Sequence, residues 1–184
     1  MTARELSERA ELDEELREQA PQGMPVRDYI RQLAAGERVR EAVTVLAQAL
    51  PKRAAIAWGL ESVRGVPQAA AKPKSAAVLE AVAEWVKEPG EERRRAAHES
   101  ARQAGFGTPA GCLGLAVFLS GGSMAPATAP VAPEPAAHLC AKAAAGAMLM
   151  AAVADPSNAP KHLQSFLERG MARAEEMELW KEEK

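Results

Sequence analysis

Three segments of this chain begin at a proline and are apolar on most of their circumference. They read PKRAAIAWGL from Pro51, PAGCLGLAVF from Pro109 and PAAHLCAKAAAGAML from Pro135. Proline is tolerated at the first position of an α-helix, and a helix that is apolar all round has to be buried by other elements. The sequence therefore predicts three central helices at these positions, wrapped by more polar ones.

The composition favours helices in the rest of the chain as well. Alanine accounts for 41 of the 184 residues, and glutamate for 22 of the 25 acidic ones, whereas there are two isoleucines and one tyrosine. Alanine and glutamate are good helix formers, and isoleucine and tyrosine favour strands. We expect an all-α fold, a compact multi-helix bundle of about seven to nine helices. Because apolar helices follow polar ones, degenerate helix-pair repeats are an open alternative.

The first part of the chain differs from the rest. Residues 3–19 place Leu6, Leu12 and Leu16 among alternating charges, and the break APQGMP follows. A thin apolar stripe of this kind is typical of a helix that packs loosely or binds a partner. We expect a peripheral charged helix and linker over 1–24, and a single helical domain over 25–184.

Small residues recur in the predicted central helices, among them Gly111, Gly114 and Gly146. Helices with such faces can approach each other closely, toward the short end of the ~8–10 Å range of interaxial distances. The sequence therefore predicts a core that depends on close helix packing. Glu61 and Arg64, three residues apart on one helix, are a candidate intrahelical ion pair.

The segment 121–135 begins with two glycines and carries four prolines. A phosphate-binding loop, a linker and a strap within one domain are the alternatives. A nucleotide loop needs a lysine, and no lysine or arginine occurs between Phe118 and Lys142. Glycines after a helix are an ordinary helix stop. We therefore expect a proline-rich strap that crosses the domain, and an exposed proline-rich ridge is also a candidate partner contact.

No catalytic, cofactor or metal site is predicted, and we expect the protein not to be an enzyme. His98, His138 and His162 are too far apart for a ligand pattern, and HESAR lacks the second histidine of a zinc-binding H-E-x-x-H. Cys112 and Cys140 lie in apolar surroundings, outside any nucleophile motif.

The net charge and the hydropathy of the chain argue against nucleic-acid binding and against insertion into a membrane. A net charge of −2 and a pI near 6.0 give no general attraction to nucleic acid. The first 20 residues lack the apolar core of a signal peptide, and the apolar run 139–154 is shorter than the ~20 residues of a spanning helix. We expect a cytoplasmic protein with no membrane insertion. Homo-oligomerisation stays open.

Three groups of residues are candidate partner contacts: a leucine stripe near the start, the one concentrated basic cluster, and an amphipathic C-terminal helix. They are Leu6, Leu12, Leu16, Arg93, Arg94, Arg95, Met177 and Trp180.

Three passages carry a resemblance to a known family: AIAWGLESVR, LAVFLSGGSMAP and AAHLCAKAAAGAMLMAAV. The matching residues are Trp58, Glu61, Ser62, Val63, Arg64 and Ser120 to Ser123. Over about residues 40–170 the chain resembles a family of uncharacterised bacterial all-helical proteins, some of them associated with type VI secretion gene neighbourhoods. The resemblance implies an adaptor or accessory role and supplies no catalytic residues; residues 1–24 lie outside it.

We therefore expect a non-catalytic protein–protein interaction module, an adaptor or accessory subunit of a larger bacterial assembly, whose partner is another protein. The alternative is a small-molecule-binding helical domain, with an apolar pocket lined by Trp58, Met148 and Met150.

Overall fold

The computed structural model describes residues 1–21, 23–126, 129 and 131–180. Over these residues the chain forms eleven α-helices and one 3-10 helix, η1, and no strand, so the all-α class is confirmed. Nine of the α-helices have at least seven residues. The elements are α1 (Ala3–Arg9), α2 (Glu14–Glu18), α3 (Val26–Ala35), α4 (Val39–Ala49), α5 (Lys52–Arg64), α6 (Pro67–Ala70), α7 (Pro73–Lys87), α8 (Glu91–Ala104), α9 (Pro109–Phe118), α10 (Leu139–Val153), η1 (Pro156–Asn158) and α11 (Ala159–Glu176).

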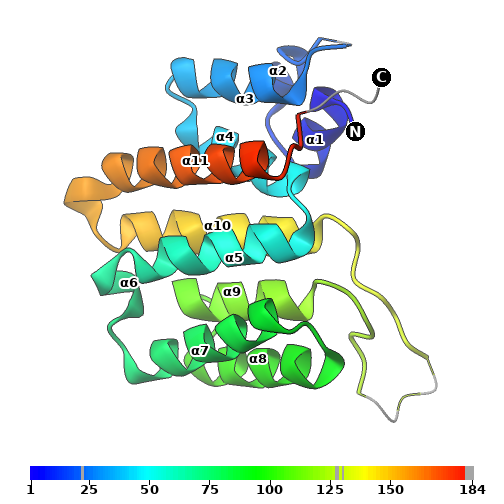
Figure 1. Ribbon diagram of the computed structural model, residues 1–184, viewed down its shortest axis with the longest axis vertical. Helices are drawn as coiled ribbons and strands as arrows, with labels where there is room; N and C mark the ends of the chain where they lie inside the picture. The colour runs from blue at the N-terminus through cyan, green and yellow to red at the C-terminus, as the bar shows by residue number, and fades with distance from the viewer. Residues whose placement is uncertain (22, 127–128, 130, 181–184) are drawn as a thin grey trace.

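The helices stack in layers along the long axis of the molecule (Figure 1). α7 and α8 form one end, α9 lies on them, α10 and α5 occupy the middle, α11 and α4 follow, and α1 to α3 close the other end. α10 packs against α9, α5, α4 and α11. α5, α9 and α10, the three helices that are apolar on most sides, are therefore the centre of the bundle, as predicted. α10 begins at Leu139, later than the start predicted at Pro135. The helix-pair repeat stays a prediction.

Threonine side chains cap the first turns of α1 and α9. The Thr2 side chain accepts a hydrogen bond from the Glu5 amide, and the Glu5 carboxylate accepts one from the Thr2 amide. Thr108 Oγ1 accepts from the Gly111 amide at 3.0 Å and caps α9. α7 begins with Pro73 at its first position, because proline fixes a helical φ there.

The N-terminal helix expected over 3–19 is divided in two. Glu11 has a left-handed φ of 53°, and the Leu12 amide donates back to the Ser7 carbonyl oxygen at 3.1 Å. This is the Schellman ending of a helix, usually formed with glycine, and it satisfies carbonyl groups that the helix would leave free. The same left-handed ending occurs at Glu37 and Glu178.

Glycines let the central helices approach closely. A Cβ atom added to Gly114 of α9 would lie 2.7 Å from the Ala101 Cβ of α8 and 2.9 Å from Val78 of α7. A Cβ atom at Gly59 of α5 would lie 2.7 Å from Leu113 of α9. The predicted close packing is therefore present, and any larger side chain at these positions would push the helices apart.

Trp58 is the largest fully buried side chain and joins α5 to α11. Its Nε1 donates a hydrogen bond to the Phe166 carbonyl oxygen at 2.9 Å. Its ring lies against Gly170, where an added Cβ atom would come within 2.6 Å of the indole. Met148 is also fully buried. This close contact gives no support to an apolar ligand pocket around Trp58, and that alternative stays a prediction.

The ion pair expected between Glu61 and Arg64 is wrong. Arg64 pairs with Glu80 of α7 at 2.6 Å, and Glu61 pairs with Arg173 of α11 at 2.5 Å. Because α5 lies between these two helices, its charged residues reach outward to different neighbours.

The packing at Gly170 predicts opposite effects for two matched substitutions. Gly170→Ala puts a methyl group into the Trp58 ring, so we expect a loss of about 1–3 kcal/mol in the free energy of unfolding. Gly146→Ala on α10 meets only Cys112 Sγ at 3.5 Å, and alanine favours a helix interior over glycine by up to about 1 kcal/mol. We expect this variant to be as stable as the original or more stable. Urea unfolding monitored by circular dichroism measures both, and equal effects would contradict the prediction.

Candidate partner-binding surface

The described residues of the loop between α9 and α10 (119–126, 129 and 131–138) project from one side of the helical body, and we call this loop the arm (Figure 1). Its two ends lie together beside Lys52. The Lys52 ammonium group donates a hydrogen bond to the Ser120 carbonyl oxygen at 2.8 Å, and its charge also acts on the Cys140 thiol. The structure thus differs from the crossing strap expected over 121–135. α9 and α10 are neighbours that run in opposite directions, so the chain leaves and returns at the same end of this helix pair.

Arg94 of α8 fixes the start of the arm from inside the protein. Its side chain is only 4% exposed, and its guanidinium group donates to the carbonyl oxygens of Phe118 at 2.6 Å and Ser123 at 2.9 Å. The same group holds the Glu91 carboxylate through two hydrogen bonds, of 2.7 and 2.8 Å. Arg94 was expected to contact a partner, but it is buried and contacts the chain's own loop instead. A planar guanidinium with several donors can satisfy buried carbonyl groups, and here it anchors the chain's own loop.

The other two arginines of the basic cluster differ from each other. Arg95 donates to the Ala125 carbonyl oxygen at 3.1 Å and to Glu91 at 2.6 Å, so it too holds the arm. Arg93 pairs with Glu88 at 2.7 Å, and its side chain is 39% exposed. Of the three, Arg93 is the one still available to a partner.

An aromatic stack supports the base of the arm, and sequence reasoning missed it. The His98 ring lies 3.9 Å from the Phe118 ring and 5.6 Å from the Phe106 ring, between centroids. The Arg94 guanidinium covers the Phe118 ring at 4.6 Å. Burial lowers the pKa of His98, which favours the neutral ring in this stack. The available signal was the two phenylalanines that flank α9, one in GFGTP and one in AVFLS.

Beyond its anchor, the arm presents apolar side chains to solvent. The Met124 amide donates to the Pro133 carbonyl oxygen at 2.8 Å, so the arm folds back on itself. Met124 is 40% exposed and Val131 is 69% exposed. Apolar groups held away from the body of a protein in this way are typical of contact surfaces.

The leucine stripe is not part of an exposed surface. Leu6, Leu12 and Leu16 are 1%, 8% and 4% exposed and belong to the hydrophobic core. The expected partner contact at these three residues is corrected, because the turn at Glu11 orients both halves of the segment toward α3 and α4. The Tyr29 hydroxyl of α3 donates to the Leu16 carbonyl oxygen at 2.7 Å and ties this segment down.

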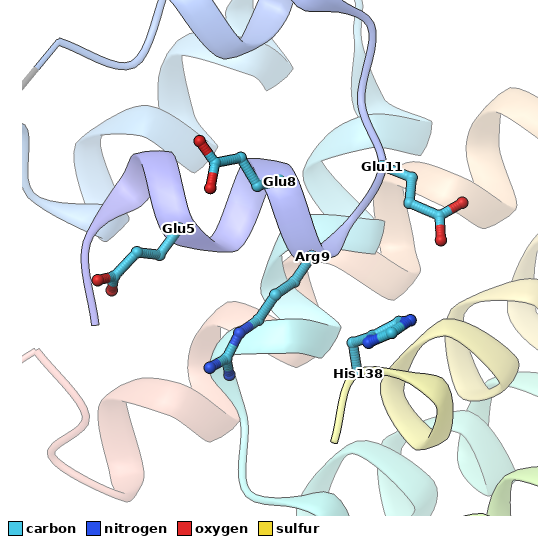
Figure 2. A pocket seen from close by; sticks show the side chains of 5 residues that line it. All are labelled: Glu5, Glu8, Arg9, Glu11 and His138. Atoms are coloured by element: carbon cyan, nitrogen blue, oxygen red, sulfur yellow. The ribbon is translucent and has the colours of Figure 1, made fainter. Parts of the chain in front are cut away.

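An open cleft of about 390 Å³ lies between α1 and the start of α10 (Figure 2). It is lined by Glu5, Glu8, Arg9, Glu11 and His138, and Figure 2 shows that the carboxylates do not converge on one point. The Glu11 carboxylate pairs with Lys142, which lowers its pKa. No group of side chains able to hold a metal ion occurs among the described residues. The cleft is therefore an acidic surface feature beside the arm.

The C-terminal candidates lie on the turn after α11. Met177 is 44% exposed, and Trp180 is partly buried. Trp180 Nε1 and Arg27 Nε lie out of solvent without a hydrogen-bond partner. A buried donor left without an acceptor costs about 1–3 kcal/mol. Both residues line one cleft of about 770 Å³, formed by α1, the start of α3 and the C-terminal turn.

The two free cysteines are buried or half-buried. Burial raises the pKa of the Cys112 thiol to about 11 and that of Cys140 to about 12, which makes both poor nucleophiles. The Asp155 carboxylate lies 2.9 Å from His162 Nε2, a contact that lowers the pKa of Asp155. This pair holds the corner between α10 and α11.

These observations define an all-α domain with a projecting, internally anchored arm. The match to a family of unknown function, DUF6931, covers residues 29–174, and the chain belongs to this family. The expectation of an uncharacterised family is thereby confirmed. No curated protein and no solved structure matches the chain significantly.

In the part of the chain that the structure describes, no single helix combines the length and apolarity needed to cross a membrane. α10 and the segment Pro156–Glu176 reach this threshold only as a pair, and they are bent by 106°.

The buried position of Arg94 predicts a large effect of its removal. Arg94→Ala leaves the Phe118 carbonyl oxygen without its donor, so we expect a loss of about 1–3 kcal/mol in the free energy of unfolding. Released from its anchor, the arm should also be cut faster by thermolysin near Met124 and Val131. Arg93→Ala is the matched control and should change neither quantity. Equal cleavage rates in both variants would show that Arg94 does not hold the arm.

The Glu91 carboxylate predicts a pH dependence of stability. Hydrogen bonds from Arg94 and Arg95 lower its pKa from 4.5 to about 2. Because the folded-state pKa is the lower one, this carboxylate contributes fully above pH 4.5, and its contribution is lost as the pH falls toward about 2. The difference in unfolding free energy between the original chain and Glu91→Gln should shrink over this range. Glu92→Gln should show no such trend, and a constant difference for Glu91→Gln would contradict the prediction.

Proposed function

We propose that this domain is a non-catalytic protein–protein interaction module, an adaptor or accessory subunit that joins a larger assembly through its arm. The proposal is carried by one observation: the arm is anchored at its start and has exposed apolar side chains beyond the anchor. Its start is clamped by the buried Arg94, while Met124 and Val131 are exposed beyond the clamp.

Such an arm is suited to binding. Prolines restrict the free conformations of a segment, so less conformational entropy is lost when a partner orders it. An extended proline-rich segment also leaves its backbone carbonyl groups available to donors on a partner. The clamp fixes the direction in which the arm leaves the body and so adds to its preorganisation.

The finer expectations rest on sequence alone. A bacterial assembly, and type VI secretion in particular, come from the resemblance of the AIAWGLESVR and LAVFLSGGSMAP passages to proteins in such gene neighbourhoods. A cytoplasmic location and the absence of an enzymatic activity, a cofactor and nucleic-acid binding belong to the same proposal.

The proposal predicts that a partner is lost when the arm loses its apolar side chains. The tagged full-length protein is captured from its native cells beside a variant with Met124→Ser and Val131→Ser, called the arm variant. We expect one stoichiometric partner with the original chain and at least about tenfold less with the arm variant, since 1.4 kcal/mol of lost contact energy corresponds to a factor of about ten.

The matched control is Val153→Ser, a 58% exposed valine at the far end of α10 from the arm. It should retain the partner. Recovery of the chain alone would overturn the interaction module, and full recovery of the partner by the arm variant would place the contact elsewhere on the protein.

A further inference from the structure

His98 is a titratable group at the base of the arm. Its ring lies 3.9 Å from the Phe118 ring and 5.6 Å from the Phe106 ring, between centroids, and is inclined to them by only 19° and 17°. Phe118 is the last residue of α9, and Phe106 lies in the turn before α9. A histidine in the middle of α8 thus stacks on side chains at both ends of the helix from which the arm departs.

The side chains that hold the arm belong to the same cluster. Arg94 lies one turn before His98 on α8, covers the Phe118 ring at 4.6 Å and donates to the Phe118 carbonyl oxygen at 2.6 Å. Arg95, three residues before His98, donates to the Ala125 carbonyl oxygen at 3.1 Å. Histidine is the side chain whose ordinary pKa lies closest to neutral pH. The anchor of the arm therefore contains one group whose charge changes under mild conditions.

The surroundings of His98 favour its neutral form. Burial lowers the pKa of His98 below its ordinary value of 6.5, because a charged imidazole would lose part of its hydration. Among the charged groups that act on the ring, Glu99 raises this pKa, whereas Arg94, Arg102 and Arg95 lower it. The Glu99 carboxylate is also bound by Arg102 through two hydrogen bonds, of 2.7 and 2.9 Å. Protonation would thus add a fourth positive charge to one side of α8.

The elements packed against α8 offer this charge no compensation. α8 packs against α7 and α9. α9, the turn 105–108 and residues 119–126 at the start of the arm contain no charged residue. The titratable Cys112 of α9 donates to the Ala143 carbonyl oxygen of α10, on the side away from α8. The charged residues of α7 are exposed to solvent: Lys74, Glu80, Glu84 and Lys87.

We propose that protonation of His98 releases the start of the arm, so that the arm is held at neutral pH and freed in acidic surroundings. A charged His98 places like charges at i and i+4 with Arg94, which is unfavourable on a helix. The ring then gains by turning from Phe118 toward water, and the Arg94 anchor loses its neighbour in the stack. As a regulation of partner binding, this inference rests on the proposed function.

The sign of the effect follows from the lowered pKa of His98. A histidine whose folded-state pKa lies below the ordinary value contributes its full stabilisation above about pH 6.5 and loses it as the pH falls through the folded-state pKa. The pKa of Glu91, which binds both Arg94 and Arg95, is about 2. This carboxylate therefore keeps its charge in mildly acidic solution, and a release there is not due to its protonation.

The test follows the arm and His98 in purified full-length protein by nuclear magnetic resonance, from pH 7.5 to pH 5. The Met124 methyl signal, assigned by its loss in Met124→Leu, reports on the arm, and the imidazole signals of His98 report its protonation. We expect both signals to change with one midpoint, below pH 6.5. Circular dichroism at each pH confirms that the helical body stays folded.

Two variants locate the response. His98→Phe keeps an aromatic ring in the stack and removes the titrating group, so the Met124 signal should no longer change with pH. At pH 5 thermolysin should cut the arm of the original chain faster than that of His98→Phe, and their rates should converge at pH 7.5. One proton permits at most about a tenfold change per pH unit. His138→Gln, at the other end of the arm, is the matched control and should keep the full response.

Several results would overturn the inference. They are a His98 midpoint at or above pH 6.5, a Met124 signal that does not follow His98, and a response that persists in His98→Phe. Since all these measurements use the protein alone, they are independent of partner capture. If the arm is released but captures no partner, the proposed function is wrong and the release stands. If a partner is captured through Met124 and Val131 while the arm ignores pH, the interaction module stands and this inference is wrong.

Discussion

The close approach of helices at glycine positions is the constraint on which the rest of this structure depends. Gly114 admits Ala101 and Val78, Gly59 admits Leu113, and Gly170 admits the ring of Trp58. At each of these positions an added Cβ atom would lie within 3 Å of a neighbouring side chain, so glycine is what lets the helices pack at this distance. Because packing of this density transmits displacements, a single added methyl group would be felt by the helices that carry the arm as well.

The arm is held by the same body through one buried cation. Arg94 lies on α8, which α9 covers, and its two backbone acceptors, Phe118 and Ser123, come from the end of α9 and the loop beyond. Removing an arginine from water is unfavourable unless its donors are satisfied, and here Glu91 and the two carbonyl groups satisfy them. The folded core thus determines where the arm begins, while the exposed part of the arm is left to make contacts.

Much of the fold could be predicted from the sequence, since the apolar helices and their prolines specify both the centre and most helix boundaries. The errors have physical causes. The helix ending at Glu11 could not be predicted, because the left-handed residue there is a glutamate and not the usual glycine. The ion-pair partners of Glu61 and Arg64 depend on which helices lie on either side of α5. The candidate site was harder to predict than the fold, because the sequence of three consecutive arginines does not reveal that only one of them faces inward. Packing decides that, and sequence periodicity in a polar helix does not.

Because both ends of the arm meet beside Lys52, the packing of the helical body does not depend on the residues in between. A loop whose ends are fixed close together loses only about 0.6 kcal/mol of closure entropy for each doubling of its length. The arm can therefore lengthen, shorten or change in composition while α9 and α10 keep their packing. The bundle is thus a platform whose packing does not depend on the length of the loop that it carries.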